Sequence, residues 1–145
     1  MELHQERVLK VLFVLIWVLA VAHMMAEVYF LYWAFEWYDI LTHFLGGLWV
    51  GMAALWFWYL SGYIRDIETI DFRALPIAIL AGLVIGVVWE GYEYGVWMWS
   101  GSGLPINYMQ DTSLDIVVDV FGALFGYVAF KRLTQDTVTD EQLSE

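Results

Sequence analysis

Cysteine is absent from the sequence, and basic residues are scarce. Without cysteine, the chain has no disulfide, no thiolate nucleophile and no cysteine ligand for a metal. Only 6 of its 145 residues are Lys or Arg, which excludes the broad basic surface on which nucleic-acid binding depends. Charged residues make up 16% of the chain and hydrophobic residues 61%, whereas soluble domains average about 25% and about 45–50%. This balance indicates a protein of the lipid bilayer.

Hydrophobic runs occur four times along the chain, and each is long enough to cross a bilayer. A membrane-spanning helix needs about 20 predominantly apolar residues. The first run lacks the small-residue cleavage site of a signal peptide, so we expect it to be retained as a span. The sequence therefore predicts a single all-α domain, a four-helix transmembrane bundle with a polar cytoplasmic tail at residues 131–145. The four spans are expected at residues 8–29, 39–63, 74–97 and 114–130.

The basic residues all lie on one side of this four-span arrangement. Two precede the first span, two lie between the second and third, and two follow the fourth: Arg7, Lys10, Arg65, Arg73, Lys131 and Arg132. The positive-inside rule then predicts that both termini face the cytoplasm. Tryptophan and tyrosine are concentrated at the opposite ends of the spans, as in an interfacial aromatic belt.

The second and fourth spans begin with similar ten-residue sequences. Residues 39–48 and 115–124 share the pattern Asp-Ile-x-x-(His or Asp)-x-x-Gly-(Gly or Ala)-Leu. Both spans run in the same direction across the membrane, so the match is consistent with a duplicated two-helix hairpin, although ten residues in apolar sequence can also match by chance. In either case, each helix carries a polar pair four residues apart and therefore on one face.

Glycines continue these faces and predict where the helices meet. Three pairs are spaced four residues apart: Gly47 and Gly51, Gly82 and Gly86, and Gly122 and Gly126. Membrane helices associate closely where small residues let their backbones approach. Because His43, Glu90 and Asp119 lie on or near these stripes, we expect their side chains to face the interior of the bundle.

Acidic residues gather in the outer loops and the outer halves of the spans, where the sequence has no Lys or Arg. They are Glu27, Glu36, Asp39, Glu90, Glu93, Asp111, Asp115 and Asp119. An ionised carboxylate near the centre of a bilayer costs about 2.5–3.5 kcal/mol even on lenient scales. Either some of these groups are protonated, or a bound cation supplies the missing positive charge.

The spacing of these residues favours a metal site. The Asp-x-x-x-His, Asp-x-x-x-Asp and Glu-x-x-Glu motifs each place two ligands one turn apart on a helix face. Oxygen ligands with one imidazole suit a divalent Mg, Mn, Fe or Zn ion. Because six ligands exceed the needs of one ion, a two-metal site or a supporting role for some of them is also open. The predicted ligands are Asp39, His43, Glu90, Glu93, Asp115 and Asp119.

Three other polar residues receive simpler interpretations. A histidine within a membrane helix is commonly a hydrogen-bond partner inside the bundle, and for His23 we expect that partner to be Glu27, one turn on. Glu36 falls in an aromatic loop and is expected to be solvated. Asp111 is expected to cap the start of the fourth helix.

Three functions are compatible with this pattern. A metal-dependent hydrolase or transferase would use the ion to activate water against a membrane lipid or another amphiphile, with Glu93 or Asp39 as the catalytic base. A proton or cation transport component would use the carboxylates as a relay, although the inner halves of the spans are apolar. A non-catalytic accessory subunit would need them only for structure. Partners are expected within the bilayer: membrane lipid, a further copy of the chain, or another membrane protein.

The polar motifs resemble those of a known family. They are Tyr38-Asp39-x-x-Thr42-His43-Phe44-x-x-Gly47, Glu90-x-x-Glu93 and Asp111-Thr112-x-x-Asp115-x-x-x-Asp119. Together they resemble the bacterial inner-membrane family typified by YjdF. A weaker similarity extends to VanZ-like proteins, which also place an Asp-His pair on one helix and an acidic-Gly-Ala-Gly pattern on the last. The resemblance implies a multi-pass protein of the inner membrane and no particular chemistry.

Overall fold

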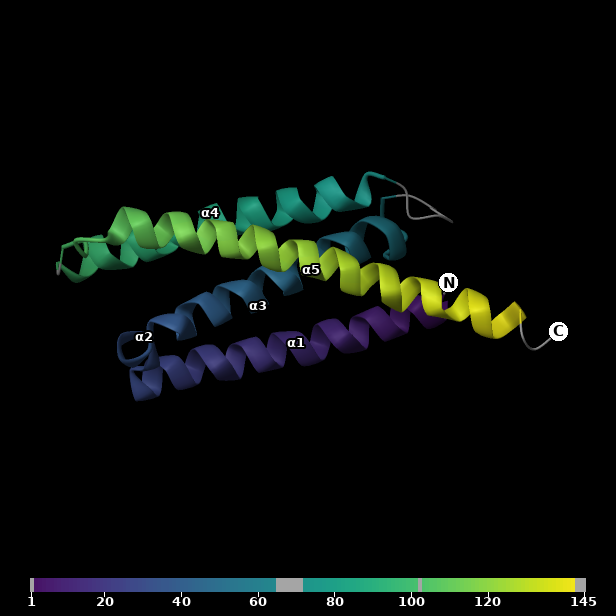
Figure 1. Cartoon of the computed structure of the whole chain (residues 1–145), viewed down its shortest axis with the longest axis horizontal. Coiled ribbons are helices and arrows are strands. Elements are labelled where there is room, and N and C mark those ends of the chain that lie inside the picture. Colours follow the sequence, from purple (N-terminus) through teal and green to yellow (C-terminus); the bar gives the residue numbers. More distant parts are fainter. Residues whose placement is uncertain (1, 65–71, 102, 143–145) are drawn as a thin grey trace.

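Long helices dominate the computed structural model, which describes residues 2–64, 72–101 and 103–142. The elements are α1 (Glu2–Tyr29), the short α2 (Leu31–Ala34), α3 (Glu36–Leu55) with a π-helical extension η1 (Trp56–Leu60), α4 (Ala74–Ser100) and α5 (Tyr108–Gln142) (Figure 1). The described ranges contain no β-strand. The predicted all-α fold is confirmed.

Four segments are long and apolar enough to cross a membrane. They are His4–Tyr29, Glu36–Leu60, Ala74–Ser100 and Tyr108–Gln135, which confirms the predicted number of spans. The four helices alternate in direction, so the two termini lie at the same end of the bundle (Figure 1). We call this the terminal end and the opposite one the far end. Arg65, one of the basic residues used to orient the chain, lies outside the described residues.

The helices extend beyond the hydrophobic runs that revealed them. α5 continues past residue 130, where we expected the span to end, as far as Gln142. α3 begins at Glu36, so this residue lies in the first turn of a helix and not in a loop, where an acidic side chain favours the positive end of the helix dipole. Adding a residue to an existing helix requires no new nucleation, so polar residues prolong a helix that the apolar run has started.

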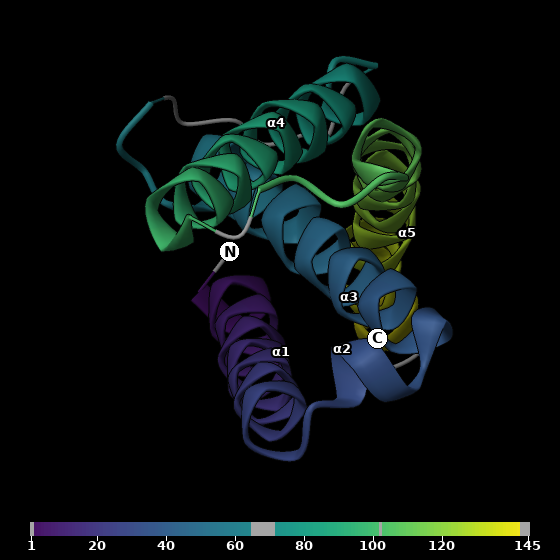
Figure 2. The ribbon, with the colours of Figure 1, turned by 90° about the vertical axis from the view of Figure 1, so that its left-hand side faces the viewer.

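Close packing through glycine joins α3, α4 and α5. α3 lies between α1, α4 and α5 (Figure 2) and packs most extensively against α5. A Cβ atom on Gly47 would overlap the backbone carbonyl of Asp119, and one on Gly122 would overlap that of Phe44. The prediction that the glycine stripes face the interior is confirmed. The buried glycines are Gly47, Gly51, Gly82, Gly86, Gly122 and Gly126.

The terminal half of the bundle has an apolar core. Val8, Met52, Leu55 and Phe130 are fully buried there and belong to one cluster. The outward faces of the helices also carry large apolar side chains, such as Phe13, which is 63% exposed. An apolar exterior around a closely packed interior is the arrangement that a lipid environment requires.

Two hydrogen bonds from α3 attach α1 to the rest of the bundle. The Tyr38 hydroxyl donates to the carbonyl of Ala22 at 3.0 Å, and Trp49 Nε1 donates to the carbonyl of Leu12 at 2.9 Å. Both acceptors are backbone carbonyls within a helix, so each donor side chain holds α1 at a defined height along α3.

Trp49→Phe is expected to destabilise the protein by about 1 kcal/mol, since it removes one such bond while retaining an aromatic ring. Chemical unfolding of the detergent-solubilised protein measures this change. Trp17→Phe is the matched control, because Trp17 is 58% exposed on α1. Equal stability of the two variants would contradict a role for the Trp49 hydrogen bond.

Candidate metal centre

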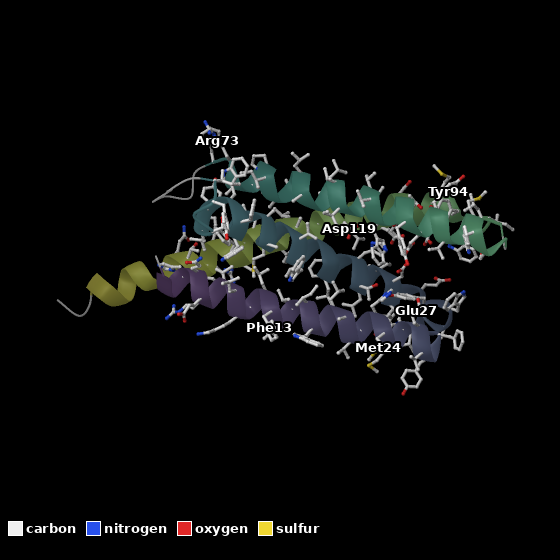
Figure 3. The ribbon with its side chains drawn as sticks, turned by 180° about the vertical axis from the view of Figure 1, so that it is seen from behind. Phe13, Met24, Glu27, Arg73, Tyr94 and Asp119 are labelled. Carbon is white, nitrogen blue, oxygen red and sulfur yellow. The ribbon has the colours of Figure 1, made fainter. Side chains whose placement is uncertain are left out.

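Four ionisable side chains are buried between α3, α4 and α5 in the far half of the bundle. The exposed fractions are 6% for His43, 5% for Glu90, 3% for Asp115 and 6% for Asp119. At a rise of about 1.5 Å per residue, His43 lies about 10 Å from the start of α3 and Asp119 about 16 Å from the start of α5. Figure 3 shows Asp119 inside the bundle, whereas Phe13 points outward. Charged groups at this depth need partners of opposite charge.

His43 lies at the centre of this group, with carboxylates facing both of its ring nitrogens. Nδ1 is 3.3 Å from Oδ2 of Asp119. Nε2 is 3.7 Å from Oδ1 of Asp39 and 4.0 Å from Oε1 of Glu90, and both distances are too long for hydrogen bonds. An ionised Asp119 accepts a hydrogen bond from the N–H at Nδ1, and the lone pair of the neutral ring then resides on Nε2. This lone pair faces Asp39 and Glu90.

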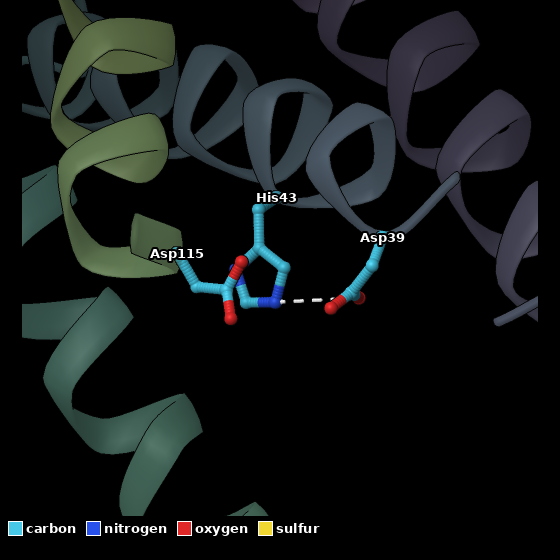
Figure 4. A group of neighbouring side chains, drawn as sticks. All are labelled: Asp39, His43 and Asp115. Carbon is cyan, nitrogen blue, oxygen red and sulfur yellow. Dashed lines mark ion pairs between the residues drawn. The ribbon is translucent and has the colours of Figure 1, made fainter. Parts of the chain in front are cut away.

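Asp115 brings a further carboxylate to the same imidazole from α5. Asp39, His43 and Asp115 each offer one atom, and these atoms lie within 4.8 Å of one another. Figure 4 shows Asp115 reaching the ring from α5, while Asp39 approaches it from His43's own helix. Two ligand atoms that are each 2.0–2.6 Å from one cation can be at most about 4–5 Å apart. The three side chains are therefore close enough to bind a single ion.

Glu90 is held by one of its carboxylate oxygens and leaves the other without a partner. Thr112 Oγ1 donates to Oε2 of Glu90 at 2.7 Å. Among the described residues, Oε1 of Glu90 has no hydrogen-bond partner, although it is buried. Burying a polar atom without a partner costs about 1–3 kcal/mol, and more when the group is charged. Thr112 thus fixes Glu90 in the orientation that directs this unsatisfied oxygen toward His43.

Thr112 was not among the residues predicted for the site. A signal for it exists in the sequence, because Thr112 precedes Asp115 by three residues and Asp119 by seven, which places all three on one helix face. A threonine in that position is also a common hydrogen-bonding residue between membrane helices. The contribution of Trp89, described next, has a similar signal, because Trp89 precedes Glu93 by four residues.

Glu93 makes its hydrogen bond with a residue outside the group around His43. Its Oε1 accepts a hydrogen bond from Nε1 of Trp89 at 2.9 Å, one turn earlier on α4. The structure therefore brings four of the predicted ligands, Asp39, Glu90, Asp115 and Asp119, to the imidazole of the fifth, His43. Glu93, the sixth, lies at the wall of an adjoining cavity of about 250 Å³. The side chain of Asp39 borders the same cavity and is 30% exposed.

His23 has a different partner from the one we expected. Its Nδ1 is 2.7 Å from the hydroxyl of Tyr32, so Tyr32 and not Glu27 is its hydrogen-bond partner. Burial raises the pKa of Tyr32 to about 12, so the hydroxyl stays protonated at neutral pH, and the tautomer of His23 decides which of the two groups donates. The sequence pattern suggested Glu27 because it lies one helical turn away. Tyr32 instead reaches His23 because α2 folds back after α1 ends.

Asp111 does not cap α5, because the helix already begins at Tyr108. The backbone N–H of Asp111 donates to the carbonyl of Asn107 at 3.0 Å, and its side chain is exposed. In the first turn of the helix, the carboxylate complements the helix dipole. Asp111 is therefore a solvent-facing residue one turn away from the buried Asp115.

Comparison with known proteins gives a family but no activity. The model of a family described as "Predicted membrane protein (DUF2238)" matches residues 4–136. The match includes all the residues around His43 and reaches from the first span into the last. No curated protein and no solved structure matches the chain.

Proposed function

The chain belongs to the DUF2238 family of predicted membrane proteins, and we propose that it is a metal-dependent hydrolase or transferase acting on a membrane amphiphile. In this proposal, the residues around His43 bind one divalent cation, either Mg, Mn, Fe or Zn. The family description states a location and no reaction, so the proposal depends on the geometry of the buried group.

The separation between Nε2 of His43 and the carboxylates is the observation that carries the proposal. Two ligands about 2.1 Å from one ion lie about 3.4 Å apart at a tetrahedral angle and about 4.2 Å apart when opposed. The distances of 3.7 Å to Asp39 and 4.0 Å to Glu90 fall within this interval. A charge-assisted hydrogen bond from a protonated imidazole would instead be about 2.7–2.9 Å long. The spacing therefore favours an ion over a proton between these groups.

Each residue of the group then has a distinct role. Asp39, His43 and Asp115 are the principal ligands, and the unpartnered oxygen of Glu90 is the fourth. Asp119 accepts a hydrogen bond from the Nδ1–H of His43 and so orients the ring, as carboxylates commonly do for metal-binding histidines. The sequence pattern made Asp119 a ligand, and the proposal assigns it this supporting role because its closest contact is with the nitrogen facing away from Glu90.

The chemistry requires a base and a polarising group. When bound, the cation supplies Lewis acidity toward the head group of an amphiphile and toward water. Glu93 is our candidate for the catalytic base, because its carboxylate borders the cavity without belonging to the ligand group. Asp39 can serve the same role at the partly exposed edge of the site.

The arrangement speaks against a transport pathway. Val8, Met52, Leu55 and Phe130 close the terminal half of the bundle with fully buried apolar side chains. A proton or cation relay needs polar groups along its whole length, whereas the buried cluster among the described residues is apolar apart from the hydroxyl of Tyr59. A purely structural role would leave the buried Oε1 of Glu90 unexplained.

We propose that both termini face the cytoplasm in the inner membrane, which puts the site in the outer half of the bilayer. The basic residues at the terminal end and in the middle loop support this orientation. Two statements stay predictions from the sequence. One is the relationship to YjdF-like and VanZ-like proteins, and the other is association with a further copy of the chain or with another membrane protein.

Metal analysis of the purified protein tests the proposal. After incubation with each candidate cation and removal of the excess, the native protein is expected to retain about one ion per chain. Asp115→Asn is expected to lose most of it, since the amide keeps the shape of a ligand but removes its charge. Asp111→Asn, an exposed change one turn earlier on α5, is the matched control and should bind as the native protein does. Absence of bound metal in the native protein, or equal losses in both variants, would refute the metal site.

A further inference from the structure

The cavity beside the His43 group changes character along its length. Near the far end its wall is polar and includes Asp39, Thr42 and Glu93. The remainder is largely apolar and includes Val50 of α3 and Ile85 of α4. A polar end followed by an apolar section matches the build of an amphiphile, whose head group and hydrocarbon chain need these two environments.

The cavity opens between α1 and α4 onto the outer surface of the bundle. Ile16 of α1, Ile85 of α4 and Trp89 of α4 line it and are also 37%, 48% and 38% exposed, respectively. Within the described part of the chain, direct contact between α1 and α4 is slight, and α3 lies between them (Figure 2). Because that outer surface is covered with large apolar side chains, the opening leads into the hydrocarbon of the bilayer and not into water.

Aromatic side chains border both ends of this opening. Toward the far end, the rings of His23 and Trp89 approach to 5.9 Å across the space between α1 and α4. Toward the terminal end, Trp49 lies in the cavity wall and is tied to α1 by its hydrogen bond to Leu12. The opening therefore has a defined height in the membrane, which is the height of the polar side chains around His43.

An apolar groove continues from the cavity toward the terminal end. It runs along α1 and α3, where Phe13 and Ala53 form part of its wall. The groove and the cavity share Ile16 and Trp49. A hydrocarbon chain that starts at the polar end of the cavity can therefore continue along the protein into the depth of the bilayer, on a surface that is apolar apart from Lys10.

We propose that the cavity binds the head group and upper chain of a single-chain membrane amphiphile with an uncharged polar head, which enters from the bilayer between α1 and α4. The volume of about 250 Å³ is just below the range of about 300–1,000 Å³ typical of complete small-molecule sites, so the rest of the chain lies in the groove. The inference names the substrate class of the proposed enzyme and rests on that proposal for the reaction, while binding of the amphiphile is tested separately.

The charge of the site excludes an anionic head group. The carboxylates at the polar end outnumber the charges of one divalent cation, and the far halves of the spans contain no Lys or Arg. An anionic head such as a carboxylate or phosphate would therefore be repelled. An uncharged head with hydroxyl groups instead donates hydrogen bonds to the carboxylates of Asp39 and Glu93 and brings no charge of the same sign.

Photolabelling of the full-length protein in phosphatidylcholine vesicles tests this inference. The probe is a monoacylglycerol with a diazirine in its chain, and the labelled residues are identified by mass spectrometry of peptides. Labelling is expected at α1, α3 and α4 residues of the cavity wall, and excess unlabelled monoacylglycerol should suppress it. Labelling that is spread over the outward faces and resists competition would overturn the proposal.

Gly46→Leu fills the cavity and should abolish this signal. Gly46 lines the cavity, and an added Cβ atom would lie 3.9 Å from Oδ1 of Asp119, at an ordinary contact distance. Because the larger side chain occupies the ligand's space, we expect cavity labelling to fall on the order of tenfold. Gly91→Leu is the matched control, since a Cβ atom on Gly91 meets nothing within 4 Å, and its labelling should equal that of the native protein. Val50→Phe is the second cavity-filling variant and decides the matter if Gly46→Leu fails to fold.

Two further measurements separate this inference from the proposed enzyme. A photoreactive fatty acid of the same chain length, ionised at pH 8, should label the cavity on the order of tenfold less than the monoacylglycerol, and equal labelling would overturn the uncharged head. Metal analysis of the same preparations identifies which proposal fails. Competitive cavity labelling without bound metal retains the amphiphile site and refutes the metal centre. Bound metal with equal labelling of native and filled variants refutes the amphiphile site alone.

Discussion

The variant His43→Ala is expected to lose the stabilisation that a divalent cation gives to the native protein. His43 is the residue that the surrounding carboxylates share, with Asp39, Glu90 and Asp119 each within 4.0 Å of one of its nitrogens. A ligand present at 100 times its dissociation constant stabilises a native state by about 2.7 kcal/mol. Thermal unfolding in detergent, with and without cation, measures this difference, and we expect it to vanish in the variant.

His4→Ala is the control for this experiment. His4 lies at the terminal end of the bundle, where its Nδ1 is 3.4 Å from the carbonyl of Leu133, far from the His43 group. The cation should raise the unfolding temperature of this variant as much as that of the native protein. A full cation-induced rise in His43→Ala would refute our assignment of the ligands. An unchanged unfolding temperature of the native protein with all four cations would refute the metal centre altogether.

Gly122→Val is expected to separate α3 from α5 and to destabilise the protein by more than about 3 kcal/mol, the upper part of the range for overpacked interiors. The reason is that the new Cβ atom would overlap the backbone carbonyl of Phe44 and lie 2.8 Å from the backbone nitrogen of Leu48. Backbone atoms of a helix cannot rotate away as a side chain can, so the two helices must move apart. Size-exclusion chromatography and chemical unfolding in detergent measure the loss.

Gly91→Val makes the same chemical change on the outward face of α4 and serves as its control. A Cβ atom there meets nothing within 4 Å, so this variant bears only the change in helix propensity, which in fact favours valine over glycine. We expect it to remain folded. Similar behaviour of the two variants would show that the approach of α3 to α5 does not depend on Gly122.

The sequence predicted the helices and their inward faces because both follow from regular spacing. Apolar length marks a span, and residues four apart share a face, so the spacing alone places His43, Gly47 and Gly51 on one side of their helix. The ends of the helices were harder to predict from the sequence. Hydrophobicity reports where the bilayer lies, whereas a helix such as α5 continues into polar sequence as far as Gln142.

The spacing of residues along the sequence could not predict which side chains of different helices contact one another. The sequence indicated that Glu90 and Asp119 face inward, but not which nitrogen of His43 each would approach. That depends on the rotation and height of α4 and α5 relative to α3, which the close contacts at the glycines determine. The hydrogen bond from Thr112 to Glu90 depends on the same rotation. The metal-binding role of these residues remains a prediction.

Asp119 contributes both to the packing of the helices and to the group around His43. Its backbone carbonyl covers the surface of Gly47, and its Oδ2 lies where a side chain of Gly86 would begin. The same oxygen orients His43. A library of variants selected only for correct folding would therefore conserve Gly47, Gly86 and the volume of Asp119 whether or not the protein were active. Conservation at these three positions alone would say nothing about the reaction, and Asp119→Asn, which keeps the volume and changes the charge, is the substitution that separates the two demands.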